Sequence, residues 1–165
     1  MSVKPLVKLF EHNNWANQQI VQVCLSLSDE QLDAEPQSAT SGSIRHTLLH
    51  LAAAQQGYLS LLTVPFEARR SVTPAFAEAE ESIHASGEGL LALVSGESGG
   101  LPETKLQTRH GYLVEPWVVL VQVINHATEH REQIKSMLSA LGLTAPDISG
   151  WSHGEATGAV TPMAA

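Results

Sequence analysis

Apolar residues recur every three to four positions along four long stretches of the chain, the spacing that places them on one face of an α-helix. The first helix is predicted to begin at Pro5, because a proline in the first turn loses no intrahelical hydrogen bond. Its apolar face consists of Leu6, Leu9, Phe10, Ile20, Val23, Cys24 and Leu27. The second helix is predicted to run from a cap at Ser43 to about Val64, where Pro65 ends it.

The third and fourth long helices are bounded by similar signals. Thr73 and Pro74 form a predicted N-cap and first-turn proline, and this helix is expected to end near Ser95, before a glycine-rich turn. Pro116 is expected to open the last helix. Gly142 stands where a left-handed residue commonly follows a helix. The four helices have lengths that suit a helical bundle.

The remaining segments are short or irregular. Residues 28–31 have a capping-box pattern for a short helix, residues 36–42 are expected to form a loop, and residues 104–114 an irregular loop or a small hairpin. No segment is long enough for a sheet. We therefore predict an all-α protein, an up-and-down four-helix bundle with a long crossover and a short extra helix. One domain is expected over residues 1–165, with a tail from about residue 146.

Composition narrows the function classes. The chain has 165 residues, of which 43% are hydrophobic, and this is typical of a globular domain. Its formal charge is −8, so its surface repels phosphate backbones and anionic lipid headgroups. We expect no nucleic-acid partner and no membrane partner.

The only cysteine, Cys24, lies among apolar residues of the first helix and is predicted to be a core thiol. A single cysteine excludes an intrachain disulfide and a cysteine-rich zinc site, which fits a reducing compartment. The first residues contain no apolar signal-peptide region, and no apolar run approaches a membrane span. A cytoplasmic location is expected.

Two histidines share the apolar face of the last helix. At 100° per residue, His126 and His130 fall on one stripe with Val119, Val123, Ile134, Met137 and Leu141. Imidazoles at i and i+4 on one helix face can chelate a single metal ion. The alternative is two core histidines, each with its own hydrogen-bond partner, and the helix alone does not decide between them.

A third histidine favours the metal. On the second long helix, His50 lies at the edge of the buried stripe, whereas His46 lies further round and is expected to be a surface residue or a neighbour of the ligands. Three imidazoles leave a fourth position open, as in catalytic rather than structural metal sites. Residues 126–130 also spell the H-x-x-E-H motif of some metalloproteases. Glu129, however, points to the polar face, and we interpret it as a solvated charge.

Four stretches together resemble the DinB-like superfamily of bacterial metal-binding four-helix bundles. The most specific is the H-x-x-x-H-R-x-Q-I pattern of residues 126–134, which is followed by Leu138 and Gly142. The others are Asn14-Trp15-Ala16-Asn17, Leu49-His50-Leu51, and the tail Asp147–Gly158 with Trp151 and Glu155. In that tail His153 replaces an aromatic residue that many relatives carry.

The resemblance implies metal ligation by His50, His126 and His130, with nickel, zinc or iron as the divalent ion, and a homodimer. It further implies a metal-dependent transferase in which a low-molecular-weight thiol such as bacillithiol, mycothiol or glutathione attacks an electrophilic small molecule. Neither catalytic nor thiol-binding residues are assigned. Two alternatives stay open: a non-catalytic metal-binding or stress-response module, and a helical dimerisation protein without metal.

Overall fold

The computed structural model describes residues 4–37 and 42–163, and within them the chain is mostly helical. The elements are α1 (Pro5–Leu25), α2 (Asp29–Asp33), α3 (Ile44–Thr63), η1 (Phe66–Ala68), η2 (Phe76–Glu78), α4 (Ala79–Ser95), β1 (Leu106–Gln107), β2 (Leu113–Val114), α5 (Pro116–Ala140) and α6 (Gly150–Ala156). The predicted all-α class is confirmed. Part of the loop predicted at 36–42 lies outside the described residues.

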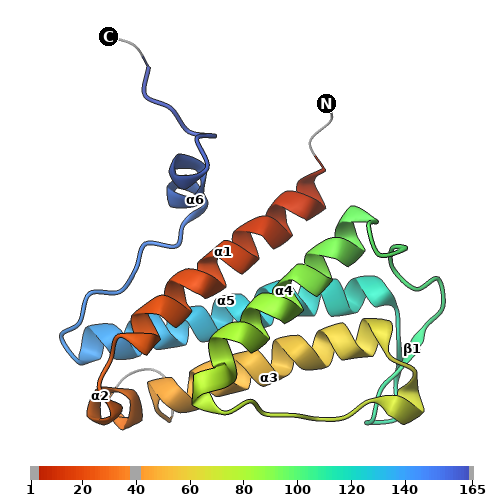
Figure 1. Cartoon of the computed structure of the whole chain (residues 1–165), viewed down its shortest axis with the longest axis horizontal. Coiled ribbons are helices and arrows are strands. Elements are labelled where there is room, and N and C mark those ends of the chain that lie inside the picture. Colours follow the sequence, from red (N-terminus) through yellow and green to blue (C-terminus); the bar gives the residue numbers. More distant parts are fainter. Residues whose placement is uncertain (1–3, 38–41, 164–165) are drawn as a thin grey trace.

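The four long helices pack as a bundle in which α1 and α3 lie diagonally opposite each other (Figure 1). Helices α1 and α5 run in one direction, and α3 and α4 run in the other. The predicted long crossover therefore connects α3 to α4 over residues 64–78 and returns the chain along the length of the bundle. This path makes α3 and α5 antiparallel neighbours, so that one face of each looks toward the other.

Most predicted helix boundaries are confirmed. Ser28 and Gln31 form a capping box, in which the Gln31 N–H donates to Ser28 Oγ at 3.2 Å and the Ser28 N–H donates to Gln31 Oε1 at 3.0 Å. The Ser43 hydroxyl caps α3. Gly142 has φ +74°, and the Leu143 N–H reaches back to the Leu138 carbonyl at 2.9 Å, which is the hydrogen bond of a Schellman motif.

The predicted start of the third long helix was wrong. Residues 73–75 are not helical, and the chain becomes helical only at η2, which leads into α4. The reason is a backward hydrogen bond. The Ala75 N–H donates to Glu78 Oε2 at 3.0 Å, as in the second half of a capping box, and so the first turn follows Ala75 rather than Thr73.

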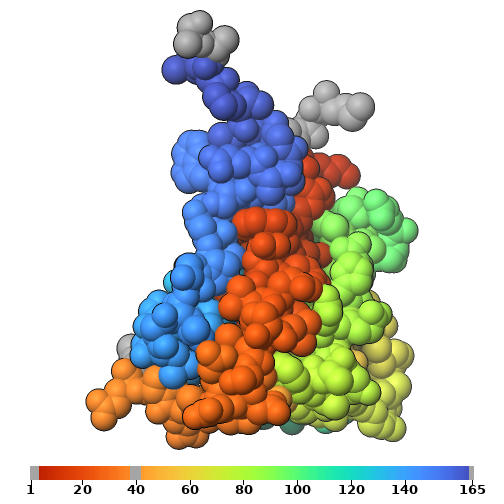
Figure 2. Space-filling view, turned by 60° about the vertical axis from the view of Figure 1, so that its left-hand side comes forward, coloured from red at the N-terminus to blue at the C-terminus, as the bar shows by residue number. Residues whose placement is uncertain are grey.

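Two further segments match or extend the prediction. Residues 104–114 form a small antiparallel hairpin with Leu106 paired to Val114, one of the two forms expected. The tail contains a short helix, α6, which was not predicted and which begins at a Ser149 cap. Figure 2 shows the C-terminal segment standing on the N-terminal half of α1 rather than joining the bundle.

A buried polar network ties the four long helices together. Arg131 of α5 is only 3% exposed, and its Nη1 donates to Asn13 Oδ1 and Asn17 Oδ1 of α1, both at 2.7 Å. Asn17 Nδ2 donates to Gln55 Oε1 of α3 at 2.8 Å. Gln55 Nε2 continues to Ser86 Oγ of α4, also at 2.8 Å. Because these bonds have directions and fixed lengths, they set the register of α5 against α1 and α3.

The α1–α4 contact depends on a small residue. A Cβ at Gly87 would lie 2.7 Å from Asn14 Oδ1, closer than van der Waals contact allows. Gly87 therefore lets α4 approach the polar side of α1. Within the described residues, no helix is long and apolar enough to cross a lipid bilayer.

Candidate metal centre

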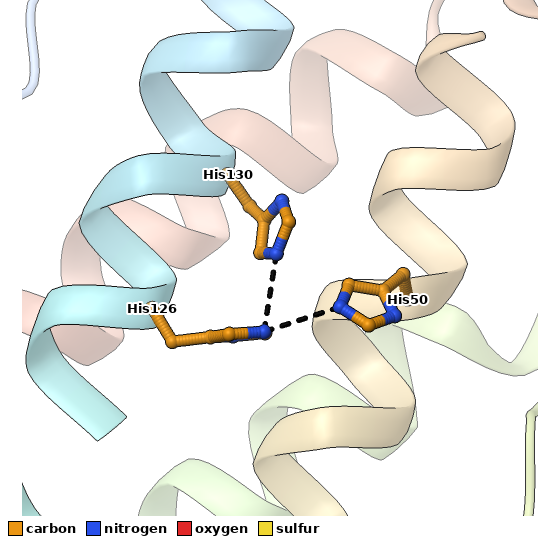
Figure 3. Close-up of side chains that lie close together, drawn as sticks. All are labelled: His50, His126 and His130. Carbon is orange, nitrogen blue, oxygen red and sulfur yellow. Dashed lines mark hydrogen bonds between the residues drawn. The ribbon is translucent and has the colours of Figure 1, made fainter. Parts of the chain in front are cut away.

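Three imidazoles from two helices meet at one point beside α3 and α5 (Figure 3). His126 Nε2 lies 3.1 Å from His50 Nε2 and 3.1 Å from His130 Nε2. All three nitrogens lie within 4.8 Å of one another, the one such cluster of three ligand side chains found in the described part of the chain. The side chains predicted as ligands are therefore brought together.

Hydrogen bonding among the imidazoles does not account for this convergence. An imidazole nitrogen has one in-plane site, which holds either a proton or a lone pair, and His126 Nε2 faces two other nitrogens with that single site. Two nitrogens bound tetrahedrally at about 2.0–2.1 Å from one ion lie about 3.3 Å apart, close to the observed spacing. The donor set and its spacing fit a divalent transition metal ion.

The local sequence explains why the histidines lie at the edge of the core. His50 is the residue before the buried Leu51. On α5, the buried Ala127 directly follows His126 and comes three residues before His130. As a result His126 and His130 are half-buried and His50 is exposed. The predicted apolar stripe on α5 is buried above and below the pair, but the imidazoles themselves face an opening rather than the core interior.

One ligand candidate is held by a neighbour on its own helix. His130 Nδ1 lies 2.6 Å from Gln133 Oε1, one turn further along α5. An amide oxygen accepts, so Nδ1 carries the proton and the lone pair of His130 is at Nε2, which points to the other two rings. Partners of this kind orient metal-binding histidines and raise their basicity.

Burial favours the neutral form of two of the imidazoles, those of His50 and His126. Burial lowers the pKa of His126 to about 4, with further lowering from the nearby His130 and His50. Burial also lowers the pKa of His50, followed by the effects of His130 and His46. Neutral imidazole is the form that binds metal, and so these two side chains are ready to act as ligands at neutral pH.

A cavity of about 540 Å³ opens beside the triad, and His50 and His126 line it. Its wall on α3 includes the small residues Ala53, Ala54 and Gly57, followed by Ser60 and Leu61. Tyr58 also lines it, with its ring edge-on to that of His126 at 5.6 Å between centroids. The volume is in the range of small-molecule sites.

The other residues weighed in the sequence lie outside this centre. His46 is exposed and does not join the triad, and Glu129 is exposed on the polar face of α5, as predicted. Cys24 is buried in the core, and burial raises the pKa of its thiol to about 12. His153 packs on Trp15, with 5.1 Å between ring centroids, in the contact between α6 and α1.

The partners of Arg131 and Gln133 were not predicted from the sequence. The i, i+3 spacing of His130 and Gln133 was a usable signal for the second partner, because residues three apart on a helix are neighbours. No comparable local signal indicated which helix Arg131 would reach.

Comparisons with known proteins identify the family of the chain and a similar fold. The family model described as the DinB family matches residues 1–159. The fold resembles the crystal structure of a protein assigned to the DinB family from Exiguobacterium sibiricum 255-15, with a TM-score of 0.66 and 16% sequence identity over 90% of this chain and 100% of that one. No curated protein matches the chain. Because the family model spans nearly the whole sequence, the chain belongs to the DinB family.

Proposed function

We propose that this protein holds a divalent transition metal ion on His50, His126 and His130 and acts as a transferase that joins a low-molecular-weight thiol to an electrophilic small molecule. The observation that carries the proposal is the convergence of three imidazole Nε2 atoms beside a cavity of about 540 Å³. Nickel, zinc and iron(II) all accept three imidazoles, so the donor set leaves the metal open among these.

The residues of the chain have separate tasks in this proposal. His50, His126 and His130 would hold the ion, and Gln133 keeps His130 in the tautomer that presents Nε2. The ion would supply Lewis acidity, which favours the thiolate form of a thiol at neutral pH. Small side chains of α3 in the wall of the cavity leave room for substrate beside the triad.

The bond-forming step uses no protein nucleophile. The thiol loses its proton to solvent, and the thiolate sulfur donates an electron pair to the electrophilic atom while the leaving group departs with its own pair. Cys24 takes no part, because it is buried in the core and its pKa of about 12 keeps it protonated.

Location and assembly belong to the same proposal. A cytoplasmic protein meets reduced low-molecular-weight thiols, and its one buried cysteine requires no oxidising compartment. We also propose a homodimer, which is supported by Trp117 and Val121, one turn apart on α5 and 62% and 51% exposed. Light scattering on a sizing column tests the dimer, and a monomeric mass at micromolar concentration argues against it.

The experiment that tests the function starts with elemental analysis of the untagged protein beside the His126→Ala/His130→Ala variant. About one equivalent of a transition metal is expected in the parent and none in the variant. The loaded protein is then assayed with thiols and electrophiles for the thioether product. Metal without any transfer favours a non-catalytic metal-binding module. No metal, even after reconstitution with nickel, zinc and iron(II), overturns the proposal.

A further inference from the structure

The cavity beside the histidine triad is strongly basic, although the protein as a whole is acidic. Three of the nine Lys and Arg residues line it, namely Arg69, Arg70 and Arg109, together with His110. The first two lie in the crossover after α3, and Arg109 lies in the turn between β1 and β2. Among the residues that the structure describes, no aspartate or glutamate lines the cavity.

These three arginines differ from most other cations of the described chain in their partners. Ion pairs with carboxylates are formed by Lys8, Arg45, Lys105 and Lys135. Lys4 donates to a main-chain carbonyl, and the buried Arg131 donates to side-chain oxygens of the framework. Arg69, Arg70 and Arg109 lie together, form no ion pair with a carboxylate among the described residues, and donate to main-chain carbonyls. Grouping like charges without a counter-charge raises the electrostatic energy, and an anion in the cavity lowers it.

Hydrogen bonds to main-chain carbonyls hold the three arginines close together. The Arg69 carbonyl accepts from Arg70 Nη1 at 2.9 Å and from Arg109 Nη2. The Arg69 guanidinium donates to the Val64 carbonyl at 2.8 Å and to the Gln107 carbonyl. Arg69 therefore joins the crossover to the hairpin. Its carbonyl is the shared acceptor that brings the side chains of Arg70 and Arg109 together.

Donor groups remain for a ligand. A guanidinium has five N–H donors, and the main-chain contacts of Arg109 account for only one of its nitrogens. Arg70 is exposed and uses Nη1 alone in its described contacts. Carboxylates and phosphates match the fork geometry of such groups with two parallel hydrogen bonds.

We propose that Arg69, Arg70 and Arg109 form an anion subsite, so that the small molecule bound beside the triad carries a carboxylate or phosphate group. The inference rests on the proposed function for the role of the bound molecule, and it deepens that function by naming the substrate class. The anionic group lies at the arginines while the reactive end of the same molecule lies at the histidines. The acid group belongs either to the thiol or to the electrophile.

The test compares acids with their esters by calorimetric titration of the full-length protein. One pair is glutathione and glutathione diethyl ester, which share a thiol and differ in carboxylate charge. The second pair is succinate and dimethyl succinate, which have no thiol. We expect at least one acid to bind about tenfold or more tightly than its ester, a difference typical of one or two charge-assisted hydrogen bonds. The net charge of −8 opposes this preference, so overall electrostatics do not produce it.

Arg70→Gln/Arg109→Gln is the informative variant, because it removes two exposed guanidinium groups and leaves the bonds of the Arg69 guanidinium to the Val64 and Gln107 carbonyls in place. It should bring the affinity for the acid down to that for the ester. Lys105→Gln is the matched control, since Lys105 is an exposed cation near the hairpin that pairs with Glu115 outside the cavity. It should keep the preference for the acid.

The outcomes separate the two proposals. Preference in the glutathione pair alone places the acid on the thiol, and preference in the succinate pair alone fits an acidic electrophile. The proposal is overturned if neither acid exceeds its ester, or if the preference survives in the double variant. The titrations are run with metal-free and metal-loaded protein. A preference for acids without any metal binding leaves the subsite standing and removes the metal-dependent function.

Discussion

Two polar clusters lie side by side on α5, and they differ in whether the atoms that meet are complementary donors and acceptors. Arg131 donates to Asn13, Asn17 and Thr128, and the network continues through α3 to α4. His130 is the residue before it, yet its Nε2 faces another imidazole nitrogen. Polar groups that are paired inside the protein hold helices together. Groups that converge on one another without adequate pairing mark a place for a ligand.

A second histidine cluster supports the same distinction. His12 donates from Nε2 to the Ile148 carbonyl at 2.9 Å, and its ring lies 5.5 Å from that of His153. The Trp15 ring lies 5.1 Å from that of His153 and 6.0 Å from that of His12. These histidines lie in the contact between α1 and the C-terminal segment, and within the described residues they belong to no cluster of three ligand side chains. Convergence of three ligand atoms, rather than the presence of neighbouring histidines, distinguishes the candidate metal site.

The largest expected effect is the loss of metal. The variant His126→Ala/His130→Ala should fall from about one equivalent of bound metal to none, because one imidazole retains little affinity. His12→Ala/His153→Ala removes the same number of histidines from the other cluster and should keep the full equivalent. Elemental analysis after dialysis measures both variants. If both double variants lost the same amount of metal, the two histidine clusters would contribute equally to metal binding, and the distinction drawn between them would be wrong.

The next effect is on stability. Arg131→Met should lower the free energy of unfolding by about 3 kcal/mol, because two buried amide oxygens lose their donor. Arg131→Lys keeps a donor and should lose less. Urea denaturation gives the free energies, and the folded Arg131→Met protein should still bind about one equivalent of metal. Full stability combined with lost metal would assign Arg131 to the metal centre instead of the framework.

A smaller effect is expected at the partner of His130. Gln133→Ala should weaken metal binding about tenfold, because His130 then loses the acceptor that holds its tautomer and orientation. Glu129→Ala is the control on the same helix, and its affinity should stay at the parent value, since Glu129 is exposed on the opposite face. Competition with a chelator dye measures both affinities. If only Glu129→Ala weakened metal binding, the H-x-x-E-H motif would be the better interpretation of residues 126–130.

The smallest effect concerns the buried thiol. Burial raises the pKa of Cys24 from 9.0 to about 12, so above pH 9 the unfolded thiol ionises while the folded one stays protonated. Stability therefore falls as pH rises in this window, by about 1 kcal/mol between pH 9 and pH 10. Thermal unfolding of the parent and of Cys24→Ala isolates this contribution, which only the parent should show. Identical pH dependence in the two proteins would mean that the thiol is less buried.

Much of the fold was predictable because its signals are local. Ser43 and Gly142 bound helices through hydrogen bonds to residues about one turn away, and Pro5 begins a helix because its fixed φ suits the first turn. The sequence predicts all three boundaries. The start of α4 was mispredicted because Thr73 and Ala75 both precede plausible first turns. A single side-chain contact from Glu78 selected the later one.

Some features of the candidate site also follow from local spacing, and others depend on how the helices pack. That His126 and His130 share a helix face follows from the helical period alone, and so does the position of Gln133 one turn away. The meeting of His50 with this pair requires α3 and α5 to be neighbours in the right register. The buried bonds of Arg131 and Gln55 contribute to that register, and they join residues far apart in the sequence.

The sequence by itself determined the four helices, the residues on their faces and the three histidines with ligand chemistry, because these depend on the spacing of nearby residues. The tertiary structure decided which helices lie together, and it brought Arg69 and Arg70 to Arg109 across about forty residues of chain. Contacts of this kind depend on how the loops pack over the bundle. The energy of that packing is shared among many side chains, and no local pattern encodes it.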